Sequence, residues 1–313
     1  MPTVSTHQLS DEEIIKSFRG YEGPVEPGFV IDFLGVKTRS SYICGLPQEG
    51  AVVGYPIPAG IQGNAIEYAG VLRAVLEAEQ QVVAVELGAG WAPWLVTAAR
   101  AAALRGIDQV NLVGVEGCKE HCEFMVTHFL DNGLEPEHHR LIHGVAGILD
   151  GMAHFPVLAD PAANYGARAL ADQSPAGTDN ANGSLLRRLT RKSWRMARQG
   201  IKTAITGSNG TVQVRRYSLP TLLGPFAKVD LVHVDIQGDE YDVLASARRV
   251  LKEKVKRLVI GTHGRDIEQK LLDELASQSM VLESDEACHF MQHHDRMVLQ
   301  HDGCQVWRNP ALS

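Results

Sequence analysis

Residues 82–96, VVAVELGAGWAPWLV, place a β-branched run directly before a glycine-rich turn. The run predicts a buried strand, and Pro93 suits the first turn of a helix that follows. A strand, a glycine turn and a helix in this order bring backbone amides against a nucleotide. This segment therefore predicts an α/β fold with a nucleotide site at the end of a strand.

The alternation of strand and helix continues along the chain and predicts a mainly parallel sheet. Apolar runs bounded by turn residues predict seven strands, at 82–87, 110–116, 139–147, 229–236, 256–263, 281–284 and 304–308. Helical periodicity predicts the principal helices of this sheet at about 93–105, 119–132, 240–251 and 267–277.

Two segments interrupt this alternation. Residues 1–75 contain Gly- and Pro-rich loops, which predict an irregular N-terminal cap that ends in a helix near 67–79. Residues 150–215 are predicted to be an insertion with a low-complexity centre. We therefore expect a cap over 1–75 and a nucleotide-binding domain over 76–313 that carries this insertion.

The insertion contains a basic segment, LLRRLTRKSWRMARQGIK, at 185–202. Wound as a helix, it separates an apolar half from a half rich in Arg and Lys. One interpretation is a lid helix that packs by its apolar half and leaves a solvated basic face. The other is a peripheral contact with an anionic membrane or a phosphorylated substrate.

Composition limits the partners and the compartment. The chain has 313 residues and a net charge of −7, which argues against a nucleic-acid partner. The first residues lack the pattern of a secretory signal, and no apolar run reaches the roughly 18–20 residues that span a bilayer. Five scattered cysteines favour a reducing compartment. These features predict a cytoplasmic location.

The residues around the glycine turn favour S-adenosylmethionine over a dinucleotide. Dinucleotide sites use GxGxxG, whereas Pro93 replaces the third glycine here. Glu86 ends the first strand, where it would repel a pyrophosphate and attract an ammonium group. Glu116 ends the second strand, where a carboxylate can accept hydrogen bonds from both ribose hydroxyls. NAD and S-adenosylmethionine pockets share this role, so Glu116 indicates a nucleoside without distinguishing the two.

Two later segments resemble the FkbM-type S-adenosylmethionine-dependent methyltransferases. Members have a K-I-D-V-E-G-A-E-like strand end, and residues 233–240 read HVDIQGDE here. The next strand ends in VIGTHG at 259–264, where the family has an acid before His-Gly. The resemblance covers about 80–150 and 215–310. It implies that 76–313 is a methyltransferase domain with a Rossmann-like seven-stranded class I methyltransferase sheet.

The resemblance also implies an O-methyltransferase that converts S-adenosylmethionine to S-adenosylhomocysteine. Its acceptor would be a hydroxyl of a sugar, glycan or secondary metabolite. Two residues depart from the family pattern: Gln237 stands where glutamate is usual, and Gly261 where an acid is common. If those carboxylates serve as a base or as metal ligands, this chain uses other residues or does not catalyse.

Polar residues at the strand ends supply candidates for the chemistry. We predict His263 as the general base, since imidazole titrates near pH 6.5, and Asp235 as the residue that orients the acceptor, the base or the methionine end of the cofactor. A divalent metal held by Asp235, Asp239 and His263 is permitted by the spacing but not required by it. The predicted cofactor-binding residues are Glu86, Gly88, Ala89, Gly90, Trp91, Glu116 and Asp235.

Two other functions stay open at this point. An NAD(P)-dependent oxidoreductase would share the sheet, but it needs the glycine fingerprint that Pro93 interrupts. A non-catalytic nucleoside-binding scaffold would keep the fold and use 185–202 as an interaction surface. The departures at Gln237 and Gly261 favour this second alternative, and the sequence does not indicate an oligomeric state.

Overall fold

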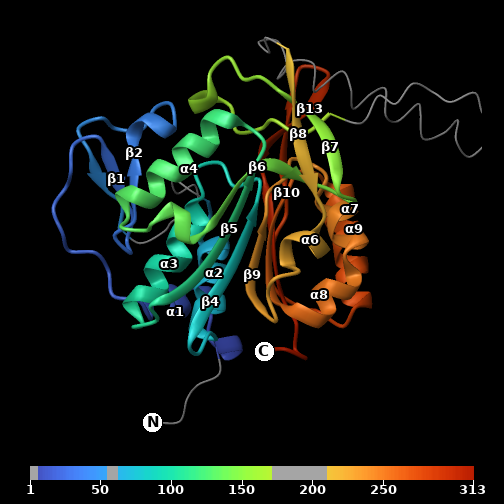
Figure 1. The fold of residues 1–313 in the computed structure, drawn as a ribbon, viewed down its shortest axis with the longest axis horizontal. Helices are drawn as coiled ribbons and strands as arrows, with labels where there is room; N and C mark the ends of the chain where they lie inside the picture. The colour runs from blue at the N-terminus through green and yellow to red at the C-terminus, as the bar shows by residue number, and fades with distance from the viewer. Residues whose placement is uncertain (1–5, 55–62, 171–209) are drawn as a thin grey trace, which may run out of the picture.

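The computed structural model describes residues 6–54, 63–170 and 210–313 (Figure 1). The seven predicted strands are all present in it. They are β4 (Gln81–Leu87), β5 (Gln109–Glu116), β6 (Arg140–Ala146), β9 (Val229–Val234), β10 (Val255–Thr262), β11 (Val281–Glu286) and β14 (Gly303–Arg308).

These strands form one sheet in the order β11-β14-β10-β9-β4-β5-β6. The five strands from β10 to β6 run parallel, whereas β14 lies antiparallel between β10 and β11. A doubly wound dinucleotide-binding sheet has the order 3-2-1-4-5-6. Here the seventh strand is inserted, in reverse, between the fifth and the sixth. This arrangement confirms the predicted Rossmann-like class I methyltransferase sheet.

Two strands extend the sheet beyond β6, and the sequence analysis missed both. They are β8 (Thr211–Tyr217), which pairs parallel to β6, and β7 (Gly151–Pro156), which pairs antiparallel to β8. β7 lies inside the segment 150–215 that was predicted as an insertion, and β8 begins inside it and ends two residues beyond it. The basic segment 185–202 lies outside the described residues, so its predicted contacts stay predictions.

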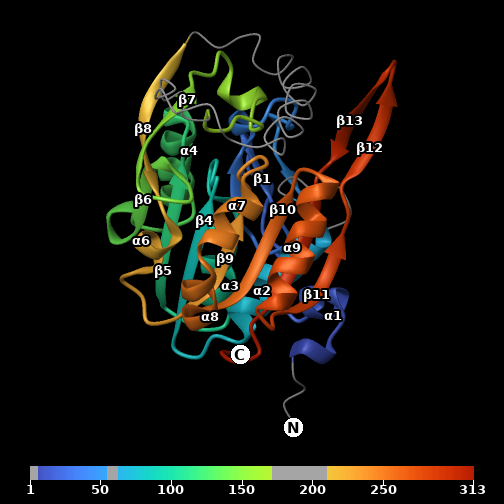
Figure 2. The same cartoon turned by 90° about the vertical axis from the view of Figure 1, so that its right-hand side faces the viewer.

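Helices cover both faces of the sheet (Figures 1 and 2). One face carries α2 (Ala65–Leu76), α3 (Pro93–Leu104) and α4 (Lys119–Asp131). The other carries α6 (Leu219–Leu223), α7 (Glu240–Ser246), α8 (Arg248–Lys254) and α9 (Arg265–Ser277). The single helix predicted over 240–251 is thus two helices. Ala247 N–H donates to Leu244 O, three residues back, and this tighter turn ends α7.

The strands direct alternate residues into two separate cores. Along β9, Leu231 packs with residues of α2 and α3, whereas Val232 and Val234 pack with residues of α7, α8 and α9. His233 follows Val232 by one residue and therefore lies on the α2–α3 face.

The N-terminal region packs against this α2–α3 face. Helix α1 (Asp11–Lys16) contacts α2, and a small sheet pairs β1 (Phe29–Ile31) with β2 (Lys37–Arg39) and β3 (Ala51–Val52). Arg39 makes a bidentate ion pair with Asp131 at the end of α4, at 2.6 and 2.8 Å. Short 3-10 turns occur at Thr6–Gln8, Ser40–Tyr42, Pro136–His138 and Pro161–Ala163.

A hairpin precedes β14 in the chain and lies outside the main sheet. It consists of β12 (His289–His293) and β13 (Arg296–His301) and projects away from the body of the molecule (Figure 2). Among the helices within the described residues, none is long and apolar enough to cross a membrane.

Candidate active site

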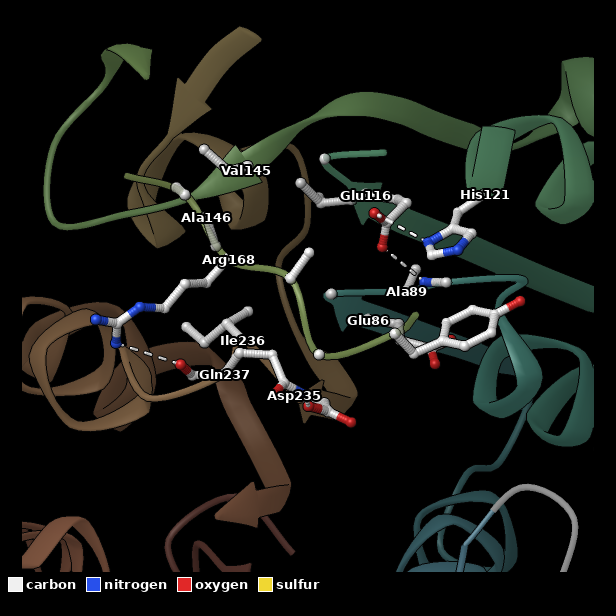
Figure 3. A pocket seen from close by; sticks show the side chains of 18 of the residues that line it. Glu86, Ala89, Glu116, His121, Val145, Ala146, Arg168, Asp235, Ile236 and Gln237 are labelled. Carbon is white, nitrogen blue, oxygen red and sulfur yellow. Dashed lines mark hydrogen bonds and ion pairs between the residues drawn. The ribbon is translucent and has the colours of Figure 1, made fainter. Parts of the chain in front are cut away.

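A cavity of about 520 Å³ opens at the carboxyl ends of the parallel strands. The chain order reverses between β4 and β9, and open α/β sheets bind ligands at such a switch point. The cavity is lined by the glycine turn after β4, the ends of β5 and β9, and the segment 165–169. Figure 3 shows Glu116 and His121 on one side of it and Asp235 and Gln237 on the other.

The glycine turn is fixed by its close contact with β9. Gly88 has a φ of 74°, and a Cβ atom on it would lie 1.7 Å from Asp235 O. Only glycine permits both this backbone conformation and this approach. Gly90 also has a positive φ, 54°, and α3 begins with Pro93 at its first position. The predicted residues Gly88, Ala89, Gly90 and Trp91 all line the cavity.

Glu116 lies at the cavity wall and is held by backbone amides. Its Oε2 accepts from Gly90 N–H at 2.8 Å and its Oε1 from Cys118 N–H at 2.6 Å. His121 Nδ1 lies 3.6 Å from the same carboxylate. Burial disfavours the charged form of His121, but Cys118 and Glu116 outweigh it and raise its pKa to about 10. The structure thus places Glu116 beside the glycine turn, as a ribose-binding carboxylate requires.

Glu86 also lines the cavity, but its carboxylate is turned toward a helix. Its side chain is 1% exposed, and Oε2 accepts from Leu95 N–H in the first turn of α3 at 3.1 Å. Burial raises the pKa of Glu86 well above its ordinary value. The predicted contact between Glu86 and an ammonium group stays a prediction.

Asp235 and His263 form a pair at the ends of β9 and β10. His263 Nε2 lies 3.3 Å from Asp235 Oδ1, and its Nδ1 lies 2.8 Å from Glu240 Oε1. Asp235 is 39% exposed and lines the cavity, whereas His263 is 8% exposed and lies behind it. Burial disfavours the imidazolium, but the two carboxylates outweigh it and raise the pKa of His263 to about 11.

This geometry argues against the general-base function predicted for His263. A histidine with this pKa already carries a proton at pH 7, and both of its ring nitrogens face carboxylates. Asp235 separates it from the cavity. The contacts with His263 and Gln237 outweigh burial and lower the pKa of Asp235, so it is ionised. The pair therefore presents a fixed carboxylate to the cavity.

The two departures from the family pattern both lie next to Asp235. Gln237 Nε2 donates to Asp235 Oδ1 at 3.0 Å, so the amide orients the carboxylate. A Cβ atom on Gly261 would lie 3.6 Å from Asp235 Cγ, an ordinary van der Waals distance. An acid at position 261 would therefore add a second negative charge beside Asp235.

No cluster of three or more His, Cys, Asp or Glu side chains within the described residues is arranged to hold a metal ion. The set Asp235, Asp239 and His263, which the sequence permitted as metal ligands, is not brought together. His263 instead contacts Asp235 and Glu240.

Segment 165–169 crosses the cavity, and no sequence signal identified it. The Tyr165 ring stacks on His121, with centroids 4.2 Å apart and planes 6° apart. Its hydroxyl donates to Tyr42 O in the N-terminal region at 2.8 Å. Arg168 follows, with Nη1 3.4 Å from Gln237 O. These contacts join the N-terminal region and the predicted insertion at the cavity.

The chain is similar to known methyltransferases. The methyltransferase FkbM domain matches residues 133–296, more than half of the chain. A protein of Jannaschia sp. (strain CCS1) named "Putative methyltransferase" is 29% identical over 300 residues, 95% of this chain and 98% of that protein.

Two solved structures are also similar. The methyltransferase FkbM of Methylobacillus flagellatus KT is 10% identical, with a TM-score of 0.41, over 77% of this chain and 54% of that chain. The precorrin-6y C5,15-methyltransferase of Geobacter metallireducens GS-15 is 10% identical, with a TM-score of 0.40, over 81% of this chain and 92% of that chain.

The match of the family domain includes both segments on which the sequence resemblance depends, 233–240 and 259–264. The first segment contains Asp235, which lines the cavity, and the second contains His263, which lies behind it. The strand order and directions are those expected for a class I methyltransferase. The chain belongs to the methyltransferase FkbM domain family.

Proposed function

We propose that the protein is an S-adenosylmethionine-dependent O-methyltransferase acting on a hydroxyl of a sugar, glycan or secondary metabolite. The observation that supports a bound nucleoside is the position of Glu116, and the family and the strand order favour S-adenosylmethionine as that nucleoside. Its carboxylate lies at the cavity wall, directly beside the glycine turn, at the end of the strand next to β4. A ribose diol bound there would donate to it.

Further features of the cavity fit this cofactor. Its volume of about 520 Å³ suits a ligand of nucleoside size. Trp91 Nε1 is buried at the cavity without a hydrogen-bond partner among the described residues, so it can donate to a bound ligand. Glu116 and Asp235 make the wall acidic, which favours an ammonium and a sulfonium over a pyrophosphate.

S-adenosylmethionine, when bound, supplies a methyl group on a positively charged sulfur. The protein contributes chiefly by holding the acceptor oxygen in line with that group. Asp235 is the exposed, ionised carboxylate at the switch point, and it would accept a hydrogen bond from the acceptor hydroxyl. His263 and Gln237 position Asp235 through contacts of 3.3 and 3.0 Å.

Calorimetric titration with S-adenosylmethionine, S-adenosylhomocysteine, NAD and NADP tests the proposal. We expect micromolar binding of the two sulfur nucleosides only. Glu116→Gln should weaken that binding about tenfold, through loss of a charge-assisted hydrogen bond. The matched control is Glu123→Gln, an exposed glutamate on α4. Binding of NAD or NADP alone would overturn the cofactor assignment.

A further inference from the structure

We propose that His233 is the proton acceptor for the hydroxyl that is methylated, and that Glu67 holds it in the required tautomer. This inference rests on the proposed function and adds a catalytic residue to it. Neither residue was identified as catalytic from the sequence.

His233 is placed at the cavity by the alternation of β9. It points to the same face of the sheet as Asp235, two residues later, and both line the cavity. Its Cα partner across β4 is Glu86. The side chain is 2% exposed, and the Trp94 ring covers it with centroids 5.2 Å apart. The imidazole is therefore held in one position and shielded from bulk water.

Glu67 orients this imidazole from the first turn of α2. His233 Nε2 lies 3.4 Å from Glu67 Oε1. The other oxygen of Glu67 accepts from Asn64 N–H at 3.1 Å, in the capping box that starts the helix. Because the carboxylate is fixed, it keeps the proton of a neutral His233 on Nε2. Nδ1 then carries the lone pair.

His233 Nδ1 is buried and has no hydrogen-bond partner among the described residues. His128, His139 and His263 also have such a nitrogen, but among these four histidines only His233 lines the cavity, where a ligand group can supply the partner. A hydroxyl bound between His233 and Asp235 would supply the missing hydrogen bond. This is the arrangement of a base that is oriented by a carboxylate on its far nitrogen.

The charges around His233 favour the proton transfer. The carboxylates near it are Glu67 on α2 and Asp235 directly after β9, and β10 contributes the apolar Val259 at the paired position. Glu86, at the paired position on β4, instead accepts from Leu95 N–H, and burial raises its pKa. Glu67 and Asp235 stabilise the imidazolium that forms when the proton arrives.

Methyl transfer is a nucleophilic substitution at the methyl carbon. The acceptor oxygen forms a bond to the methyl carbon, and the bond between that carbon and sulfur breaks. Sulfur keeps the electron pair and becomes a neutral thioether. The hydroxyl proton moves to His233 Nδ1 and later passes to water, which restores the neutral imidazole.

The first test is independent of the acceptor. Histidine side-chain NMR of the protein bound to S-adenosylhomocysteine reports which ring nitrogen of His233 carries the proton, with His233→Asn identifying the signal. We expect the ring to carry its proton on Nε2 at pH 8, with Nδ1 unprotonated. Protonation on Nδ1 at pH 8, or a ring that stays charged at pH 8, would overturn the proposal.

The second test is the pH dependence of kcat for methyl transfer to a panel of methyl glycosides. His233→Asn should lower kcat by about 100-fold or more and remove the acidic limb of the profile. Its Kd for S-adenosylhomocysteine should stay within about twofold of the wild type, and His154→Asn, an exposed histidine on β7, is the matched control.

Glu67→Gln is a second variant that keeps His233 in place. An amide retains an oxygen for Asn64 N–H but presents an NH2 donor to Nε2, so the ring proton should move to Nδ1 and kcat should fall. An active wild type whose acidic limb survives His233→Asn would refute the inference and leave the proposed function intact. A wild type that binds neither sulfur nucleoside would instead refute the proposed function.

Discussion

Two histidines lie near Asp235, His233 at the cavity wall and His263 behind it, and their surroundings differ. His233, on β9, has a single carboxylate on one ring nitrogen and no partner on the other among the described residues. His263, after β10, has Glu240 on one nitrogen, and Asp235 at 3.3 Å and Asp302 at 3.8 Å on the other. Both are nearly buried. The number of carboxylates, rather than the degree of burial, distinguishes them.

The difference shows how one residue type can be structural or reactive at neighbouring positions. Asp235 and Glu240 hold His263 as a cation at neutral pH, which keeps Asp235 ionised and fixed. One carboxylate leaves the second nitrogen of His233 available for a ligand. Substitutions at His263, Asp235 and Gly261 test whether these surroundings determine the role of each residue.

Removal of His263 should have the largest effect on stability. His263→Ala removes the cation beside Glu240, which is 0% exposed and among the described residues keeps only the backbone amides of Ile236 and Gly238 as hydrogen-bond donors. Loss of one partner from a buried pair costs about 3–5 kcal/mol. Urea unfolding at pH 7 measures this cost, with His154→Ala as the exposed control, expected within about 0.5 kcal/mol of the wild type. A loss below about 1 kcal/mol would show that the pair is not a structural element.

The contribution of His263 should also depend on pH. Its pKa is about 11 in the folded protein and about 6.5 in an unfolded chain, so folding favours the proton. The stabilisation is complete below about pH 6.5, declines as the pH rises, and is absent above the folded pKa. The difference in unfolding free energy between wild type and His263→Ala should therefore shrink from pH 6 to pH 10. A difference that is constant over this range would contradict the assignment of a charged His263.

Asp235→Asn should impair turnover more than stability. The amide keeps the shape of the side chain but gives up the charge that faces the acceptor and pairs with His263. We expect methyl transfer to fall about 100-fold, the effect of a misplaced reacting group. Single-turnover assays measure this, and Asp266→Asn, on the exposed first turn of α9, serves as the control. Wild-type turnover in Asp235→Asn would mean that the carboxylate does not act on the acceptor.

Gly261→Ala should have the smallest effect. The new methyl group would meet Asp235 at an ordinary contact distance, and alanine costs less conformational entropy than glycine in a strand. We expect a change in unfolding free energy within about 1 kcal/mol, in the stabilising direction, with His263 still charged. Thermal unfolding of the variant checks this. A clear destabilisation would show that this side of Asp235 has no free space.

The fold could be predicted where the residues of a single strand form a recognisable apolar run. Each of the seven strands is a short apolar run, and Glu86, Glu116 and Asp235 follow from their positions at strand ends. Strands β7 and β8 were missed because they are partly exposed, and runs such as TVQVRRY mix polar and apolar residues. The break at Ala247 was missed because alanine favours a continuous helix.

The site was less predictable because its key contacts join distant parts of the chain. Glu67 and His233 are 166 positions apart and meet only because α2 packs across β9. Tyr165 and Arg168 reach the cavity on an irregular segment with no periodicity. The charge state of His263 depends on Glu240, whose carboxylate could equally have faced solvent from a first helical turn.

The reversed direction of β14 connects the β12–β13 hairpin to the cavity edge of the sheet. Because β14 runs against its neighbours, its first residues lie at the same edge of the sheet as the cavity, and Asp302 lines that cavity. The hairpin β12–β13 ends immediately before Asp302, while its tip, at His294 and Asp295, lies away from the body (Figure 2). A fluorophore or a surface tether at this tip would leave the core strands undisturbed. The hairpin ends next to Asp302, a residue of the cavity, so a fluorophore at its tip would report ligand binding.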